Sequence, residues 1–165
     1  MRNLSELAAV LLLIGAVSGL AYAEQNTAVI TVQVTVVSAP CEINNNQLID
    51  VDFGSSVITT DVAKGTVEKP VNYTLDCANA DQSKMLVMRI SGAGADFDSN
   101  VLKTSIAELG IKMKADGADY PLNSDLVLAS PTDKPALTAL LVQQPGAHLP
   151  TGGFTAGATM TVNYQ

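Results

Sequence analysis

The sequence is 165 residues long, carries a formal net charge of −7, and is 47% hydrophobic but only 4% aromatic. Its nine Lys and Arg residues are scattered and form no basic stripe, so we expect no nucleic-acid partner. A chain of this length is expected to form one domain with its own core.

The first 23 residues have the features of a secretory signal peptide. Arg2 precedes an apolar run from Leu7 to Leu20, and Ala21-Tyr22-Ala23 supplies small residues for cleavage after Ala23. The uninterrupted apolar stretch is shorter than the roughly 20 residues that a spanning helix requires. We therefore expect export and no stable membrane insertion.

The segment 24–38 contains a run of alternating residues, from Thr27 to Val37, that is typical of a β-strand. A free arm so rich in β-branched residues would be an exposed, adhesive strand, so it is expected to pair with something. Alternation alone does not distinguish the first strand of the chain's own sheet from a strand that pairs with another chain. One face would carry Ala28, Ile30, Val32, Val34 and Val36.

Further along the chain the clear periodicity is two, and Gly, Pro, Asn or Asp interrupts the runs at short intervals. The predicted class is all-β, and the regular turn signals favour an immunoglobulin-like sandwich. An Asp116-Gly117 turn predicts a hairpin, and Ser105–Leu109 could form a short helical turn. The expected strands are Leu48–Phe53, Val71–Cys77, Met85–Ile90, Gly110–Ala115 and Leu137–Val142.

The longest clean alternation lies at the C-terminus and predicts a strand from Phe154 to Tyr164. Its polar face would carry Thr and Asn residues together with Gly157. Its apolar face would carry Phe154, Ala156, Ala158, Met160, Val162 and Tyr164.

Cys41 and Cys77 are the only cysteines. In an exported protein two cysteines most simply form one disulfide, and the alternation before Cys77 directs its side chain into the core. The alternative is a reactive thiol pair, but the close Cys-x-x-Cys spacing of such pairs is missing.

The sequence offers little for catalysis or metal binding. His148 is the single histidine, it lies in a loop, and no nucleophile motif surrounds it. Asp96 and Asp98 lack the spacing and the glycine of a calcium loop. We expect no enzyme activity, no catalytic residue, no metal and no cofactor.

The elements that carry a family resemblance follow one another along the whole mature chain. They are the alternating arm before Ala39-Pro40-Cys41, the Val51-Asp52-Phe53-Gly54 segment, Cys77 at a strand end, Gly110-Ile111-Lys112-Met113 before Asp116-Gly117, Gly152 fourteenth from the C-terminus, and penultimate Tyr164. In this order they resemble the pilin subunits of the chaperone-usher pathway, as found in type 1 and P-like fimbriae.

The resemblance implies that residues 39–165 form an incomplete immunoglobulin-like β-sandwich that lacks its final strand. A periplasmic chaperone would first supply that strand, and the arm 24–38 of the next subunit would replace it at an outer-membrane usher. The product would be a fibre on the cell surface that supports adhesion. The groove that accepts the strand would be bordered by Phe154, Ala156, Ala158, Met160, Val162, Tyr164 and Gln165.

Val34 departs from the family pattern, which commonly has a glycine seven residues before the first cysteine. The larger side chain indicates an altered partner groove, a different register, or a specialised minor subunit, and we predict that Val34→Gly changes the rate or choice of partner pairing. A minor or rod subunit, a tip adaptor and a pilus terminator all stay open as roles. A function of another class, a stand-alone secreted binding module with a complete sandwich, is opposed by the lack of Trp for stacking on sugars.

Overall fold

The computed structural model describes residues 40–165. The predicted signal peptide and the whole of the predicted arm 24–38, including Ala28, Ile30, Val32, Val34 and Val36, lie outside the described residues.

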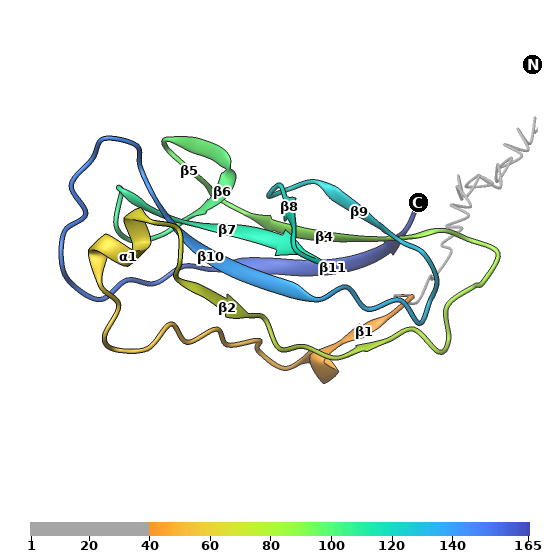
Figure 1. Ribbon diagram of the computed structural model, residues 1–165. Helices are drawn as coiled ribbons and strands as arrows, with labels where there is room; N and C mark the ends of the chain where they lie inside the picture. The colour runs from red at the N-terminus through yellow and green to blue at the C-terminus, as the bar shows by residue number, and fades with distance from the viewer. Residues whose placement is uncertain (1–39) are drawn as a thin grey trace, which may run out of the picture. The chain divides into compact units, whose positions relative to one another are not determined.

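Strands dominate the described part, and most of them belong to two sheets (Figure 1). The larger sheet has the order β2-β10-β7-β6-β5, and β8 pairs with β7. All of its pairings are antiparallel. Its strands are β2 (Glu68–Pro70), β5 (Gly94–Ala95), β6 (Asp98–Lys103), β7 (Leu109–Ala115), β8 (Ala118–Tyr120) and β10 (Leu137–Gln143).

The second sheet has three antiparallel strands in the order β11-β4-β9. These are β4 (Leu86–Gly92), β9 (Asp125–Leu128) and β11 (Ala158–Tyr164). A two-stranded pair joins β1 (Glu42–Ile43) to β3 (Leu75–Asp76). The helical elements are η1 (Asn44–Asn46) and α1 (Thr59–Ala63), and no helix among residues 40–165 is long and apolar enough to cross a membrane.

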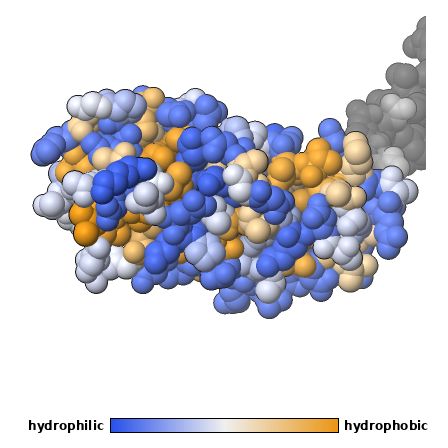
Figure 2. Space-filling model, viewed as in Figure 1, coloured by the Kyte–Doolittle hydropathy of each residue, from blue (hydrophilic) through white to orange (hydrophobic). Residues whose placement is uncertain are grey.

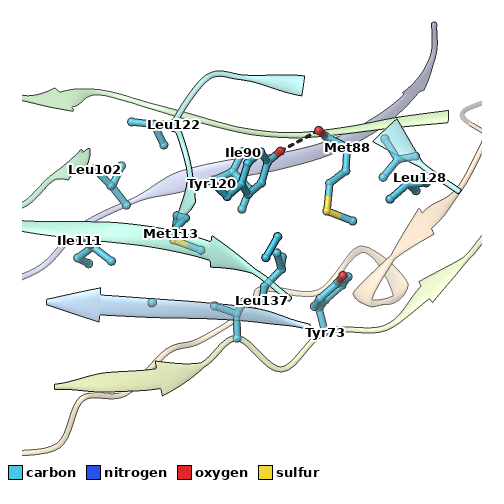
Figure 3. Packing of buried hydrophobic residues seen from close by; sticks show 14 of the residues in the cluster. Tyr73, Met88, Ile90, Leu102, Ile111, Met113, Tyr120, Leu122, Leu128 and Leu137 are labelled. Carbon is cyan, nitrogen blue, oxygen red and sulfur yellow. Dashed lines mark hydrogen bonds between the residues drawn. The ribbon is translucent and has the colours of Figure 1, made fainter. Parts of the chain in front are cut away.

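The core lies between the two sheets, because strands of both direct alternate side chains toward each other (Figure 3). Met88 on β4 and Leu141 on β10 are completely buried. The hydroxyl of Tyr120 donates a hydrogen bond of 2.8 Å to the Met88 carbonyl oxygen and so links the sheets. Burial raises the pKa of Tyr120 to about 12, which keeps this donor protonated.

Most of the expected strands are confirmed. β4 and β10 coincide with two of them to within two residues, and β7 and β8 form the predicted hairpin. Asp116 and Gly117 both have positive φ, of 50° and 81°, as a tight two-residue hairpin turn requires.

Four other expectations are wrong in whole or in part. Leu48–Phe53 is not a strand, and within Val71–Cys77 only Leu75–Asp76 pairs as one, although the predicted alternation of burial is present in both. Ser105–Glu108 forms a bend and a turn instead of a helix, and Leu109 already belongs to β7. The last strand begins at Ala158 and not at Phe154.

The predicted disulfide between Cys41 and Cys77 is formed. The pairing of β1 with β3 brings the two cysteines together, because they flank the paired residues Glu42 and Asp76. The covalent loop from Cys41 to Cys77 therefore encloses the whole segment between η1 and β2, including α1.

Candidate functional site: a groove between two unequal walls

A groove of about 1150 Å³ opens into the sandwich between two segments that are far apart in sequence. One wall is the chain from Gln47 to Ser55, and the other is the C-terminal segment from Leu149 to Met160. The base consists of core side chains from both sheets: Ile90, Leu102, Ile111, Met113, Ala139 and Leu141. The groove thus leads directly to the hydrophobic core.

The C-terminal wall is built on β11, which is hydrogen-bonded along its length to one neighbour. Its residues Ala158–Tyr164 pair with Gly92–Leu86 of β4. In the described part of the chain β11 is the end strand of its sheet, so its second edge has no strand beside it. Backbone N–H and C=O groups along such an edge are available to another strand.

Before β11, the same wall is attached to the other sheet. The Ser105 N–H donates to the Thr155 carbonyl oxygen at 2.9 Å, and the Thr155 N–H donates to Ser105 Oγ at 3.0 Å. Ala156 forms an isolated bridge with Thr104. The chain therefore changes sheets near Gly157, which explains why the strand begins later than its alternation predicts.

The opposite wall has the sequence of a strand but no ladder. Ile49, Val51 and Phe53 are half-buried, whereas Asp50 and Asp52 between them are exposed. Among residues 40–165, no backbone group from Leu48 to Val57 bonds to another backbone group. Figure 1 shows this stretch, between η1 and α1, without a strand arrow.

Apolar surface is uncovered at this wall. On the face drawn in Figure 2, hydrophobic residues emerge at several places among polar ones. Leu48, which lines the groove, has 89% of its surface exposed, the highest value among the large exposed apolar side chains of the described part. Leu48 therefore leaves apolar surface uncovered at the rim of the groove.

The charge of the groove is low and of one sign. Asp50 and Asp52 are its only charged lining residues in the part of the chain that the structure describes, and both are on the rim. No cluster of three His, Cys, Asp or Glu side chains within residues 40–165 could hold a metal ion. An uncharged, apolar occupant suits such a lining best.

The structure divides the residues that we predicted for the groove into two sets. Phe154, Ala156, Ala158 and Met160 line it. Val162 is buried and paired with Met88. Tyr164 and Gln165 lie beyond the groove: the Tyr164 hydroxyl accepts from the Asp81 N–H at 2.8 Å, and the Gln165 N–H donates to the Met85 carbonyl oxygen at 3.0 Å. Their role in accepting a strand stays a prediction.

Sequence reasoning missed the whole second wall as part of the site. Its signal was present in the alternation from Leu48 to Phe53, which we interpreted as an ordinary strand. The residues missed there are Leu48, Ile49, Val51, Phe53 and Val57.

Comparison with known proteins identifies the family. The family model described as Fimbrial protein matches residues 30–165. The fimbrial-like protein YfcQ of Escherichia coli K12 is 30% identical over 141 residues, which cover 82% of this chain and 86% of YfcQ. YfcR of the same strain is 32% identical over 130 residues, or 76% of this chain and 74% of YfcR.

Solved structures agree on the fold. The P pilus rod subunit PapA matches with a TM-score of 0.56 and 21% identity, over 77% of this chain and all of the matched PapA chain. The P pilus adaptor subunit PapF matches with a TM-score of 0.53 and 25% identity, over 79% of this chain and all of the matched PapF chain. The chain therefore belongs to the fimbrial protein family and is a structural subunit of a surface pilus, a fibre built from pilin subunits.

Proposed function

We propose that this chain is assembled by the chaperone-usher pathway and that its groove accepts an extended strand from a neighbouring subunit. The observation that carries the proposal is the pair of unpartnered edges. The free edge of β11 and the stretch Leu48–Val57, which makes no backbone-to-backbone bond among residues 40–165, face one apolar groove. One inserted strand would supply hydrogen-bond partners to both edges and cover the core between them.

The arm 24–38 of a second subunit has the chemistry that the groove requires. It is uncharged from Thr27 to Val37 and presents five apolar side chains on one face, namely Ala28, Ile30, Val32, Val34 and Val36. Burying these would contribute roughly 7 to 15 kcal/mol before the costs of ordering the arm. Donation by each subunit to the next is a head-to-tail contact, so it propagates as a fibre.

The empty groove also accounts for the proposed need of a periplasmic chaperone. A subunit with an open core and two free edges is expected to aggregate unless another strand covers it in transit. A chaperone strand would occupy the groove until an outer-membrane usher brings the arm of the next subunit. The signal peptide 1–23 would direct the chain into this route.

Periplasmic expression of the full chain with and without a matching chaperone tests the proposal. We expect a much higher yield of soluble subunit with the chaperone than without it, and polymer only when the arm is intact. Equal yields of stable, monomeric protein with and without the chaperone would contradict the proposal and favour a binding module with a complete sandwich.

Matched variants locate the contact on both partners. In the arm, Val32→Asp should abolish polymerisation, whereas Gln33→Asp on the other face should not. In the groove, Met160→Asp should block strand acceptance, whereas its neighbour Thr161→Asp, which is outside the groove, should leave it intact.

A further inference from the structure

Two aromatic rings meet across the groove. Phe53 belongs to the wall from Gln47 to Ser55, which we call the unbonded wall because from Leu48 onward its backbone bonds to no other backbone group among residues 40–165. Phe154 belongs to the C-terminal wall, and both rings line the groove. Their ring centroids are 5.9 Å apart, with an angle of 50° between the planes, which lies in the favourable range for aromatic pairs. Both side chains are only half-buried. In the structure this contact joins the two walls at one position along the groove.

Glycines flank both rings on the backbone. Gly54 follows Phe53 and has a φ of +89°, while Gly152, with a φ of +144°, and Gly153 precede Phe154. A Cβ atom added to any of these three glycines would meet no heavy atom within 4 Å. The backbone beside each ring is therefore loosely packed, although the Gly54 N–H donates a hydrogen bond of 2.7 Å to Asp52 Oδ1 on the other side of Phe53. Glycine at these positions permits rotations that other residues resist.

The two rings differ in how firmly hydrogen bonds hold the backbone next to them. Thr155, next to Phe154, is bonded to Ser105 in both directions, so the C-terminal side of Phe154 is anchored. Phe53 lies within the stretch Leu48–Val57, which has no backbone-to-backbone bond among the described residues. Separation of the rings thus requires movement of the unbonded wall and no break in any sheet.

We propose that the contact between Phe53 and Phe154 is a clasp, which joins the two walls at one position along the groove and which an incoming strand must open. This inference rests on the proposed function, in which the groove accepts a strand. The clasp limits the rate at which that strand enters. It also selects against strands whose contacts with the two walls do not compensate for the ring contact that is lost.

Strand-insertion kinetics with a defined peptide test the clasp. A fluorescent peptide with the sequence of Thr27–Val37 is mixed in large excess with the full mature chain, and association and dissociation rates are followed by anisotropy. Removal of the ring contact in Phe53→Ala or Phe154→Ala should speed association about two- to tenfold, the range expected for an aromatic pair. Dissociation should also become faster, because part of the wall is lost.

The double variant separates a clasp from two independent wall contacts. Once one ring is gone there is no contact left to open, so Phe53→Ala/Phe154→Ala should associate no faster than the faster single variant. Thr161→Ala is the control, since Thr161 lies on β11 but outside the groove; it should leave both rates unchanged. Phe53→Leu and Phe154→Leu, which keep most of the apolar volume, provide the same test if an alanine variant fails to fold.

The outcomes distinguish the clasp from the proposed function. If the peptide binds the wild-type chain but associates with the Phe53 and Phe154 variants no faster than with wild type, the clasp is contradicted. The proposed strand acceptance is not contradicted by that result. Additive accelerations in the double variant overturn the clasp as well. A wild-type groove that never binds the peptide contradicts both.

Discussion

The two walls of the groove have similar sequences but different surroundings. β11 and the stretch Leu48–Val57 both contain alternating apolar and polar residues, and apart from the exposed Leu48 and Ala158 their apolar side chains are at least half-buried. β11 has β4 beside it along seven residue pairs, whereas Leu48–Val57 has no strand beside it within residues 40–165. Alternation therefore determines which side chains face the core, but a ladder forms only where a partner strand is present.

This difference predicts different responses to perturbation. The β11 wall is part of the folded sheet, so changes behind it should destabilise the whole subunit. The unbonded wall should respond mainly to its tether and to an occupant of the groove.

The largest effect is expected from the tether. The Cys41–Cys77 disulfide closes a loop that contains the entire unbonded wall. Replacing both cysteines by alanine should lower the free energy of unfolding by about 4 kcal/mol, because the unfolded chain gains the entropy of the open loop. Urea titration of oxidised wild type, reduced wild type and the variant measures this. A reduced wild type as stable as the oxidised protein would show that the tether does not hold this wall.

Truncation behind β11 should have the next largest effect. Met88 is completely buried and paired with Val162, so Met88→Ala should cost about 3 kcal/mol through lost burial and a cavity. Val51→Ala on the half-buried opposite wall should cost less than about 1 kcal/mol in the empty subunit. Equal losses in urea unfolding would contradict the inequality of the walls.

A smaller effect is expected where the C-terminal wall joins the other sheet. Ser105→Ala removes the acceptor of the Thr155 N–H and should cost about 1 kcal/mol. Hydrogen exchange at Thr155 should become faster in this variant and return toward the wild-type rate in Ser105→Thr, which restores a hydroxyl. Ser99→Ala, at an exposed position, serves as the control. Equal exchange rates at Thr155 in Ser105→Ala, Ser105→Thr and Ser99→Ala would contradict the anchoring of Thr155 by Ser105.

The smallest effect is expected on β2, where Glu68 is not one of the residues that line the groove. Glu68 has a pKa below its ordinary value of 4.5 because Thr138 donates a hydrogen bond to it and Lys114 lies 3.3 Å away. A lowered pKa contributes stability above the unfolded value that is lost as pH falls through the folded one. Wild type should therefore lose more stability than Glu68→Gln on acidification below pH 4.5. Peptide insertion should be equal in the two proteins, whereas a difference there would link this edge to the groove.

The sequence predicted the elements whose signals are local. The Asp116-Gly117 hairpin depends on a turn that its own two residues specify, and β10 and most of β4 follow from their own apolar runs. The disulfide followed from the count of two cysteines in an exported chain.

The remaining features depend on contacts between distant residues. The start of β11 at Ala158 follows from the hydrogen bonds between Thr155 and Ser105, two residues that are fifty positions apart in the chain. The five-residue helix α1 has no side-chain cap at Ile58 that would have marked its beginning. For the groove, the sequence predicted four of the lining residues near the C-terminus. To predict the lining residues of the opposite wall, one would have to know that this stretch has no strand beside it in the described part of the chain.

The position of the disulfide has a consequence for how one wall of the groove is held. Since the bond encloses the unbonded wall, a chain held in a reducing compartment would keep that wall on an open loop instead of a closed one. One wall of the groove would then gain its covalent tether only on oxidation, so a reduced chain would carry the same lining residues on a wall with greater freedom to move.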